Sequence, residues 1–371
     1  NKVAVAFTGE GGTSEGDFHE ALNTAAVWDL PVIFIIENNG YGLSTPVAEQ
    51  YRCESLVERA RGYGMGGVKI DGNNILSVYD TVKGVREYCI KNRKPYLIEC
   101  ATFRMRGHEE ASGTKYVPSY LFDVWELKDP INNFEKHLLN TGILTQEQVD
   151  IIRQDIKEYI EIELSIGMQA GPIVVNTAEE LEDVYAPFQP GQITRVVDNA
   201  TPSRFSSAAA FGTAEKRFID AIREGLQRSM RQHSNLVLMG QDIAEYGGVF
   251  KITEGFVQEF GKTRVRNTPL CESAIIGAGL GLSLKGFKSM VEMQFADFVT
   301  EGFNQIVNNL AKIHYRWGQN ADVVVRMPCG AGVGAGPFHS QSNEAWFVHT
   351  PGLKVVYPSS PMDAKGLLIA A

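Results

Sequence analysis

The sequence predicts an α/β protein built from two tandem units, each a mostly parallel sheet flanked by helices. Short runs rich in β-branched and aromatic residues alternate with stretches of helical periodicity in both halves of the chain, which is typical of strand–helix–strand units. A stretch without any periodicity separates the two halves. At 371 residues the chain is also too long for one ordinary hydrophobic core.

The first half, residues 1–185, opens on an expected strand followed by a glycine turn. Strands are expected at residues 3–7, 31–36, 67–70 and 95–101, and helices at residues 14–28 and 75–92. The run 31–36 (PVIFII) is apolar throughout, as in a strand buried on both faces. Residues 123–183 turn helical, with a long amphipathic stretch at 145–169. Ligands of such a sheet bind beyond the carboxyl ends of its strands.

Residues 186–206 concentrate Pro, Gly, Asn and Ser, and we expect them to form a linker. The second half, residues 207–371, restarts the alternating pattern. Strands are expected at residues 235–240, 264–267, 289–294, 321–327 and 353–356, and helices at residues 213–232 and 273–284. Both ends of the sequence fall inside expected elements, so we interpret it as an internal stretch of a longer chain.

The composition excludes several classes of protein. The formal net charge of −9 disfavours nucleic acid as the main partner, because phosphate binding needs clustered Lys and Arg. No apolar run approaches the roughly 18 residues that a membrane span requires. Five cysteines, an odd number without a CxxC pair, indicate reduced thiols and a cytoplasmic protein rather than a disulfide scaffold.

A candidate metal and phosphate site lies where the first two expected strands end. The glycine turn 9–12 contains Glu10, and Asn39 directly follows the next strand. Successive parallel strands end side by side, so these two residues should converge. A carboxylate, an amide oxygen and a main-chain carbonyl are hard donors that suit Mg²⁺, and glycines let main-chain N–H groups approach phosphates. Each half of the pattern alone would more often be an ordinary turn.

The stretch 9–46 (GEGGTSEGDFHEALNTAAVWDLPVIFIIENNGYGLSTP) resembles the thiamine diphosphate signature, a Gly-Asp-Gly turn followed by Asn-Asn. It is similar to the α subunit of the decarboxylating first component of 2-oxo acid dehydrogenase complexes. The resemblance implies a thiamine diphosphate-binding fold in which Glu10, Asn39 and the carbonyl of Tyr41 hold Mg²⁺. It also implies that the backbone at Gly11 and Gly12 meets the diphosphate. Glu in place of the commoner Asp resembles the branched-chain enzymes.

A second candidate group follows the expected strand 95–101. Arg104 and His108 lie on the same edge of the sheet, and guanidinium and imidazole groups suit anion binding and proton transfer. The alternative is a solvated basic turn. The segment resembles the Arg-x-x-Gly-His of the same family, whose His lines the active site. Glu109 stands where mammalian relatives carry a phosphorylatable Ser, so the same kinase control is not expected here.

A third candidate is Glu272, which ends an expected strand and leads into an apolar helix. An ionised carboxylate beside apolar residues needs a polar partner. The alternative is a helix-start Glu favoured by the helix dipole. Gly277, Gly279 and Gly281 lie inside the expected helix rather than in a turn before it, so close helix packing explains them better than a dinucleotide fingerprint.

The second half resembles the β subunit of the same component, from about Phe211 onward. The resemblance rests on LCESAIIGAGLGLSLKG, EMQFADFVTEGFNQIVNN and GPFHSQSNEAWFVHTPGLKVVYPSSP. It implies that Glu272 hydrogen-bonds the pyrimidine ring of the cofactor and that Phe298 stacks against that ring. His339 matches the active-site His of this half. On spacing alone, Phe298 would be a core residue and His339 an ordinary loop His.

The resemblance thus implies two tandem thiamine diphosphate-binding folds, as in fused forms of the α and β subunits, and a homodimer. The implied reaction is oxidative decarboxylation of a 2-oxo acid, followed by acylation of a lipoyl group on the transacylase component. His108 and His339 are the candidates for proton transfer. Branched-chain 2-oxo acids are favoured and pyruvate is the alternative. An acetoin-cleaving or transketolase-type enzyme and a nucleotide-binding regulatory module remain open.

Overall fold

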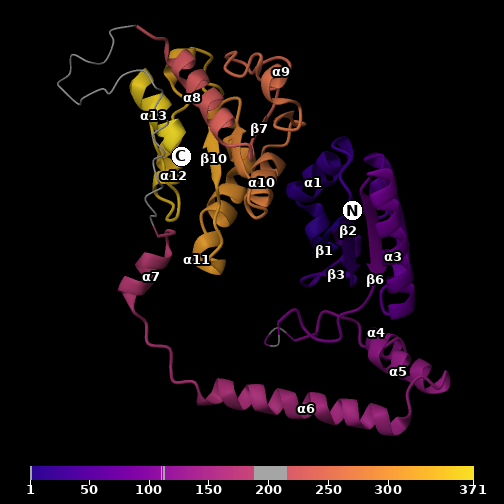
Figure 1. The fold of residues 1–371 in the computed structure, drawn as a ribbon. Coiled ribbons are helices and arrows are strands. Elements are labelled where there is room, and N and C mark those ends of the chain that lie inside the picture. The colour runs from indigo at the N-terminus through magenta and orange to yellow at the C-terminus, as the bar shows by residue number, and fades with distance from the viewer. Residues whose placement is uncertain (1, 110, 112, 188–214) are drawn as a thin grey trace. The chain divides into compact units, whose positions relative to one another are not determined.

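The computed structural model describes residues 2–109, 111, 113–187 and 215–371. The chain divides into two compact units, Asn1–Val174 and Val175–Ala371. Each unit contains a four-stranded parallel sheet with helices packed on it (Figure 1). The expected α/β class is therefore confirmed. Most of the expected linker, from residue 188 onward, lies outside the described residues.

The sheet of the first unit has the order β1-β2-β6-β5. Its strands are β1 (Ala4–Gly9), β2 (Val32–Asn38), β5 (Gly66–Asp71) and β6 (Tyr96–Ala101), and a small antiparallel pair is formed by β3 (Tyr41–Gly42) and β4 (Thr45–Pro46). The helical elements are η1 (Gly11–Ser14), α1 (Gly16–Val27), η2 (Val47–Glu49), α2 (Glu58–Gly62), α3 (Ile75–Asn92), α4 (Tyr120–Glu126), α5 (Pro130–Asn140) and α6 (Gln146–Gln169). All four strands expected in this half are present.

The side chains of β2 alternate between two hydrophobic clusters. Phe34 and Ile36 belong to a cluster that includes Leu22 of α1. Ile33 and Ile35 belong to a second cluster with residues of α3. Because alternate strand residues face opposite sides of a sheet, α1 and α3 cover opposite faces. The prediction that this strand is buried on both faces is confirmed.

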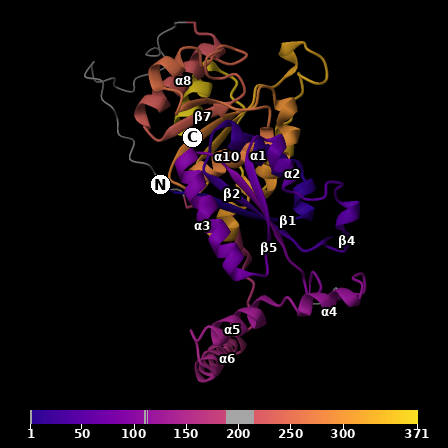
Figure 2. The same cartoon turned by 90° about the vertical axis from the view of Figure 1, so that its right-hand side faces the viewer.

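The long amphipathic stretch forms α6. It begins with a capping box, in which the Thr145 hydroxyl accepts from the backbone N–H of Gln148 and the Gln148 side chain accepts from the backbone N–H of Thr145. The helix packs beside α5 (Figure 2), where the guanidinium of Arg153 donates from Nε to Glu135 at 3.0 Å.

The sheet of the second unit has the order β10-β9-β7-β8. Its strands are β7 (Leu236–Gly240), β8 (Val265–Asn267), β9 (Lys288–Glu292) and β10 (Val323–Arg326). The helical elements are α7 (Thr177–Asp183), α8 (Phe218–Gln232), α9 (Phe256–Phe260), α10 (Glu272–Ser283), η3 (Ala296–Gly302), η4 (Gln305–Leu310), α11 (Ile313–Trp317), η5 (Ala331–Val333), α12 (Glu344–Val348) and α13 (Pro361–Ala370).

Helices α8 and α10 pack on opposite faces of this second sheet. Met290 of β9 shares a cluster with Leu226 of α8. On the other face, a Cβ placed on Gly279 of α10 would lie only 3.1 Å from the side chains of Ser289 and Val291. The prediction that these glycines serve close helix packing is confirmed for Gly279. The prediction is wrong for Gly281, because a Cβ placed there would meet no atom within 4 Å.

The strand expected at residues 353–356 is wrong, because the structure has no strand there. A strand needs a hydrogen-bonded neighbour, and in the described chain β10 pairs only with β9. Val355 and Val356 accordingly keep 37% and 61% of their surface exposed.

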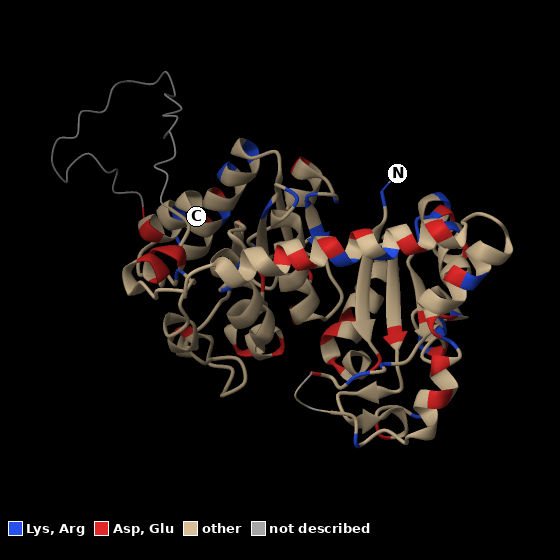
Figure 3. Cartoon of the chain, turned by 90° about the horizontal axis from the view of Figure 1, so that it is seen from below, with Lys and Arg blue, Asp and Glu red and all other residues tan. Residues whose placement is uncertain are grey.

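No helix among the described residues is long and apolar enough to cross a membrane. Figure 3 shows Lys and Arg together with Asp and Glu along the ribbons of both units.

Candidate active site

Glu10 and Asn39 meet at the carboxyl ends of β1 and β2. The two strands run parallel with Gly9 opposite Glu37, so the residues that follow them are neighbours. The backbone N–H of Asn39 donates to Oε2 of Glu10 at 3.0 Å, and Glu10 is 1% exposed. The structure therefore brings together the two residues that the sequence analysis paired. Their role as metal ligands stays a prediction.

The turn after β2 is held by its own asparagine side chains. Oδ1 of Asn38 accepts from the backbone N–H of Gly40 at 3.1 Å, and Oδ1 of Asn39 accepts from that of Tyr41 at 3.2 Å. Gly40 has a φ of +87°, which glycine adopts without steric cost. These contacts fix the backbone that carries the amide of Asn39 and the carbonyl of Tyr41.

The glycine turn after β1 makes a close backbone approach. A Cβ on Gly11 would lie 3.0 Å from Cα of Gly42, and a Cβ on Gly12 would lie 2.6 Å from Oγ1 of Thr8. The distance at Gly11 is tighter than most Cβ contacts, and the distance at Gly12 would force the Thr8 side chain to shift. The two loops that follow β1 and β2 therefore touch through glycine backbones.

The donor set at this edge fits a divalent cation. The residues here offer the buried carboxylate of Glu10, the amide oxygen of Asn39, which accepts from the N–H of Tyr41, and the main-chain carbonyl of Tyr41. All three are oxygen ligands of the kind that Mg²⁺ takes. Among the described residues no group of three or more His, Cys, Asp or Glu could hold a metal. A metal at this edge would therefore depend on amide and carbonyl oxygens as well as on the carboxylate.

Arg104 joins His108 to the same edge of the sheet. Its guanidinium lies 3.2 Å from Nδ1 of His108 and donates to the carbonyl of Leu43 at 2.6 Å. It also donates to the hydroxyl of Tyr116 at 2.9 Å, and the ring of Tyr116 lies 5.8 Å from that of Tyr41. The second candidate group is thus linked to the turn that carries Asn39, and the His108 side chain is exposed.

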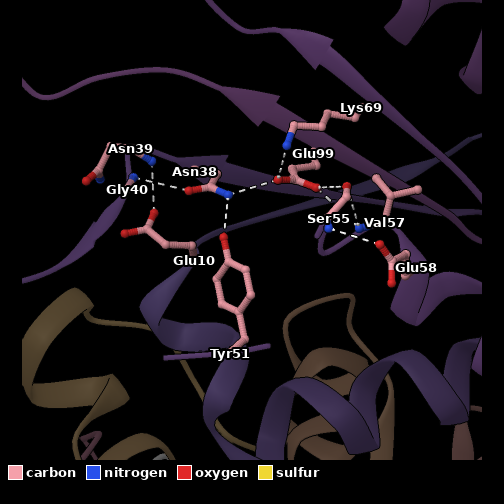
Figure 4. Close-up of polar contacts among 10 residues, drawn as sticks. All are labelled: Glu10, Asn38, Asn39, Gly40, Tyr51, Ser55, Val57, Glu58, Lys69 and Glu99. Atoms are coloured by element: carbon pink, nitrogen blue, oxygen red, sulfur yellow. Dashed lines mark hydrogen bonds and ion pairs between the residues drawn. The ribbon is translucent and has the colours of Figure 1, made fainter. Parts of the chain in front are cut away.

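The sequence analysis missed Glu99, a carboxylate in the middle of β6 that is 0% exposed. Figure 4 shows it between Asn38, Ser55, Val57 and Lys69. The signal in the sequence was a single charged residue inside the otherwise apolar strand YLIECA. A buried charge that is retained in a strand needs several compensating partners.

These partners set the protonation of Glu99. Burial on its own raises the pKa of this carboxyl group, but the hydrogen bonds from Ser55 and Asn38, the charge of Lys69 and the N–H of Val57 outweigh it. The net effect is a pKa below the usual value for glutamate. Glu99 is therefore a buried carboxylate that its surroundings keep ionised.

In the second unit, Glu272 begins α10 and faces Gln241, which directly follows β7. The amide Nε2 of Gln241 donates to Oε1 of Glu272 at 3.0 Å. Gln241 is 4% exposed, and its Oε1 has no hydrogen-bond partner among the described residues. The polar partner that Glu272 was expected to need is thus present. Nothing in the local sequence marked Gln241, which lies 31 residues away.

Phe298 and His339 pack against one another. Their ring centroids lie 5.3 Å apart at 82°, and Phe295 lies 5.1 Å from the same imidazole. Phe298 is half-buried rather than fully in the core. The structure therefore places two of the site residues predicted in this unit in contact.

Asp297 fastens the loop that carries His339. Its Oδ1 accepts from the backbone N–H of Gln341 at 3.3 Å and from the side-chain amide of Gln341 at 2.9 Å. Asp297 is 8% exposed, and its Oδ2 has no hydrogen-bond partner in the described chain. No pattern in the sequence marks Asp297, although it directly precedes Phe298.

Each of the two structural units contains a match to a different protein family. Residues 1–171 match the family described as "Dehydrogenase E1 component". Residues 215–371 match the family described as "Transketolase, pyrimidine binding domain". The matched segments contain every residue of the candidate site in its respective unit.

Relatives with known names match part of the chain. The 2-oxoisovalerate dehydrogenase subunit beta of Bacillus subtilis is 48% identical over 156 residues, which are 42% of this chain and 48% of that protein. The pyruvate dehydrogenase E1 component subunit beta of Staphylococcus aureus is 41% identical over 160 residues, which are 43% of this chain and 49% of that protein. The chain thus spans about half the length of these relatives. The first unit is thus similar to the dehydrogenase E1 component family over residues 1–171, and the second unit is similar to the transketolase pyrimidine-binding domain family over residues 215–371.

Proposed function

We propose that the protein is a thiamine diphosphate- and Mg²⁺-dependent 2-oxo acid dehydrogenase component. It would decarboxylate a 2-oxo acid oxidatively and pass the acyl group to a lipoyl group of a transacylase partner. The observation that carries the proposal is the convergence of Glu10 and Asn39 in a segment that matches the dehydrogenase E1 component family. The cofactor, when bound, supplies the carbon nucleophile and the electron sink for loss of CO₂.

The first unit would hold the metal and the diphosphate. In this proposal Glu10, Asn39 and the carbonyl of Tyr41 bind Mg²⁺, and the N–H groups near Gly11 and Gly12 face the phosphate oxygens. Support comes from the buried carboxylate, from the turn that fixes the amide, and from the close packing around Gly11 and Gly12. Mg²⁺ is usually coordinated by several water and phosphate oxygens in addition to the protein. Three protein oxygens are therefore enough for such a site.

The second unit would hold the pyrimidine ring. Glu272 hydrogen-bonds a ring nitrogen in this proposal, and Phe298 stacks on the ring face. The hydrogen bond from Gln241 supports the role of Glu272, because it fixes the carboxylate before a ligand arrives. The contact between Phe298 and His339 supports the proposal that the two rings together face the cofactor.

Arg104, His108 and His339 would handle the charge and protons of the substrate. The guanidinium of Arg104 is a fixed positive charge for the diphosphate or for the carboxylate of the 2-oxo acid. Arg104 also orients His108, since its Nη1 lies 3.2 Å from Nδ1 of that ring. The imidazoles of His108 and His339 are the groups that would give or take a proton at a ring nitrogen.

We favour branched-chain 2-oxo acids such as 2-oxoisovalerate as substrates. Relatives named 2-oxoisovalerate dehydrogenase subunit beta support this choice, and so does Glu rather than Asp at position 10. Pyruvate is the alternative, because a pyruvate dehydrogenase subunit is also among the relatives. Acetoin dehydrogenase and transketolase-type reactions share the cofactor and would differ in donor or acceptor.

We further propose that the protein acts as a homodimer in the cytoplasm. Each chain carries one diphosphate-binding and one pyrimidine-binding half, and a dimer would supply the four layers of the usual heterotetramer. Five free thiols, at Cys53, Cys89, Cys100, Cys271 and Cys329, suit a reducing compartment. Light scattering with and without cofactor tests the dimer.

The central test is a thermal shift with thiamine diphosphate and Mg²⁺ added together. We expect the protein to be stabilised and Glu10→Gln to abolish the shift. Glu15→Gln is the matched control, because Glu15 is exposed and its side chain caps no helix N–H.

Release of CO₂ from 2-oxoisovalerate, pyruvate and a ketose phosphate then separates the substrates. A protein that shows no shift would be better explained as a regulatory module.

A further inference from the structure

Glu99 lies at the centre of a hydrogen-bond network that none of the proposed ligands explains. The carboxylate accepts from Nδ2 of Asn38 at 2.8 Å and from the backbone N–H of Val57 at 3.3 Å, and it also accepts from the hydroxyl of Ser55. Nζ of Lys69 lies 3.3 Å from Oε1. A fully buried charge with this many partners is held in one position.

The register of the sheet makes Glu99 and Asn38 neighbours. Glu99 of β6 lies opposite Ile36 of β2, and Asn38 is two residues further along β2. Side chains two residues apart on a strand point to the same face, so Asn38 is the diagonal neighbour of Glu99. Lys69 of β5 lies opposite Glu99 on its other side. The contact therefore follows from the strand pairing.

Asn38 passes this constraint on to the turn. Its Nδ2 is shared between Glu99 and the hydroxyl of Tyr51, both at 2.8 Å, which leaves Oδ1 to accept from the backbone N–H of Gly40 (Figure 4). The residue between them, Asn39, donates its own N–H to Glu10. If the amide of Asn38 rotated, the turn would lose the hydrogen bond that fixes Gly40.

We propose that Glu99 is a positioning residue, which acts through Asn38 to hold the turn that presents Asn39 and the carbonyl of Tyr41 to the cation. This inference rests on the proposed function, because it concerns the same metal edge. Groups that orient metal ligands typically change metal affinity about 10- to 100-fold when they are removed. Glu99 touches neither cofactor nor metal in this proposal.

A structural role alone would have a different signature. Glu99 also fastens Ser55 and Val57 to the sheet, so removing it could destabilise the fold without affecting the turn. Ser55→Ala and Lys69→Met each remove one partner of Glu99 and leave the contact with Asn38. These two variants are therefore matched controls for loss of stability alone.

The experiment measures the Mg²⁺ concentration that gives half of the thermal shift at saturating thiamine diphosphate. Leucine at position 99 offers no acceptor for Asn38. We therefore expect Glu99→Leu to need at least about 10-fold more Mg²⁺ to reach half of the thermal shift. Glu99→Gln keeps an acceptor oxygen and should bind Mg²⁺ within a factor of about three of the unaltered protein. Ser55→Ala and Lys69→Met should also bind Mg²⁺ within this factor, even where their melting temperature falls.

Hydrogen exchange gives a readout without cofactor. The amides of Asn39 and Gly40 should exchange faster in Glu99→Leu than in Ser55→Ala, because only Glu99→Leu removes one of the two acceptors that hold the Asn38 amide. Asn38→Ala should mimic Glu99→Leu, and the double variant should be no weaker in Mg²⁺ affinity than Asn38→Ala alone.

The outcomes separate the two proposals. Absence of any Mg²⁺-dependent shift in the unaltered protein would overturn the proposed function and the positioning role with it. If the unaltered protein binds Mg²⁺ and Glu99→Leu binds it equally well, only the positioning role fails. It also fails if the effects of Glu99→Leu and Asn38→Ala on Mg²⁺ affinity add, since Glu99 would then not act through Asn38.

Discussion

The buried amide of Gln241 donates from Nε2 to Oε1 of Glu272 at 3.0 Å. The contact joins the residue after β7 to the first residue of α10, so it bridges the carboxyl edge of the sheet. The carbonyl end of the same amide has no hydrogen-bond partner among the described residues. One side chain therefore orients the carboxylate and also carries an acceptor that a bound ligand could satisfy.

Gln241→Met should separate stability from ligand binding. The variant loses a hydrogen bond to a carboxylate but also removes a buried acceptor without a partner, so the free energy of unfolding should change by about 1 kcal/mol or less. Affinity for thiamine diphosphate should fall about tenfold, which corresponds to about 1.4 kcal/mol. Urea unfolding and calorimetric titration measure the two quantities. A variant with unchanged affinity would show that Glu272 does not depend on this contact.

Gly12→Ala tests the close approach of the first loop. A Cβ there would lie 2.6 Å from Oγ1 of Thr8, so the variant should lose about 1 to 3 kcal/mol of unfolding free energy. The double variant Gly12→Ala/Thr8→Ala should recover part of the loss, because the clashing hydroxyl is gone.

Gly16→Ala is the control for that experiment. Gly16 is the first residue of α1, and a Cβ there would meet no atom within 4 Å. The substitution should be neutral or stabilise the protein by about 0.5 to 1 kcal/mol, because alanine costs less backbone entropy in a helix. Equal losses in Gly12→Ala and Gly16→Ala would mean that the steric argument is wrong.

Glu99 should make the stability of the fold depend on pH in the acid range. Its pKa is lowered in the folded protein, because hydrogen bonds and Lys69 outweigh the cost of burial. The unfolded chain therefore binds the proton first as the pH falls. The stabilisation is complete above the ordinary pKa of glutamate, about 4.3, and is lost as the pH falls through the folded value.

Urea unfolding over a series from neutral to acid pH checks this dependence. The unfolding free energy of the unaltered protein should decline more steeply below about pH 4.3 than that of Glu99→Gln, which has no proton to gain. Parallel declines in the two proteins would assign the acid sensitivity to other carboxyl groups.

The parts of the fold that the sequence predicted are those with a local signal. The apolar run of β2 predicted a strand buried on both faces, and parallel strand order predicted that Glu10 and Asn39 would meet. Both inferences need only the chain's own periodicity and the rule that adjacent parallel strands end together.

The missed features depend on partners that are distant in the sequence. Glu99 looked like one polar residue in a strand, because its partner Asn38 is 61 residues away. The strand expected at 353–356 has a suitable composition, but a strand also needs a neighbour, which composition does not reveal. Local patterns therefore predicted elements and ligand types, whereas the residues that hold the ligands in place required the fold.

Asp297 should hold the loop that carries His339 in place. Asp297→Ala removes two hydrogen bonds to Gln341, so it should cost about 1 to 3 kcal/mol of unfolding free energy and speed amide exchange at Gln341. Asp297→Asn keeps Oδ1 as the acceptor and should stay within about 1 kcal/mol of the unaltered protein. Because the imidazole of His339 packs on Phe298, only the alanine variant should loosen that contact and lower turnover. Equal turnover in both variants would show that the loop holds His339 without help from Asp297.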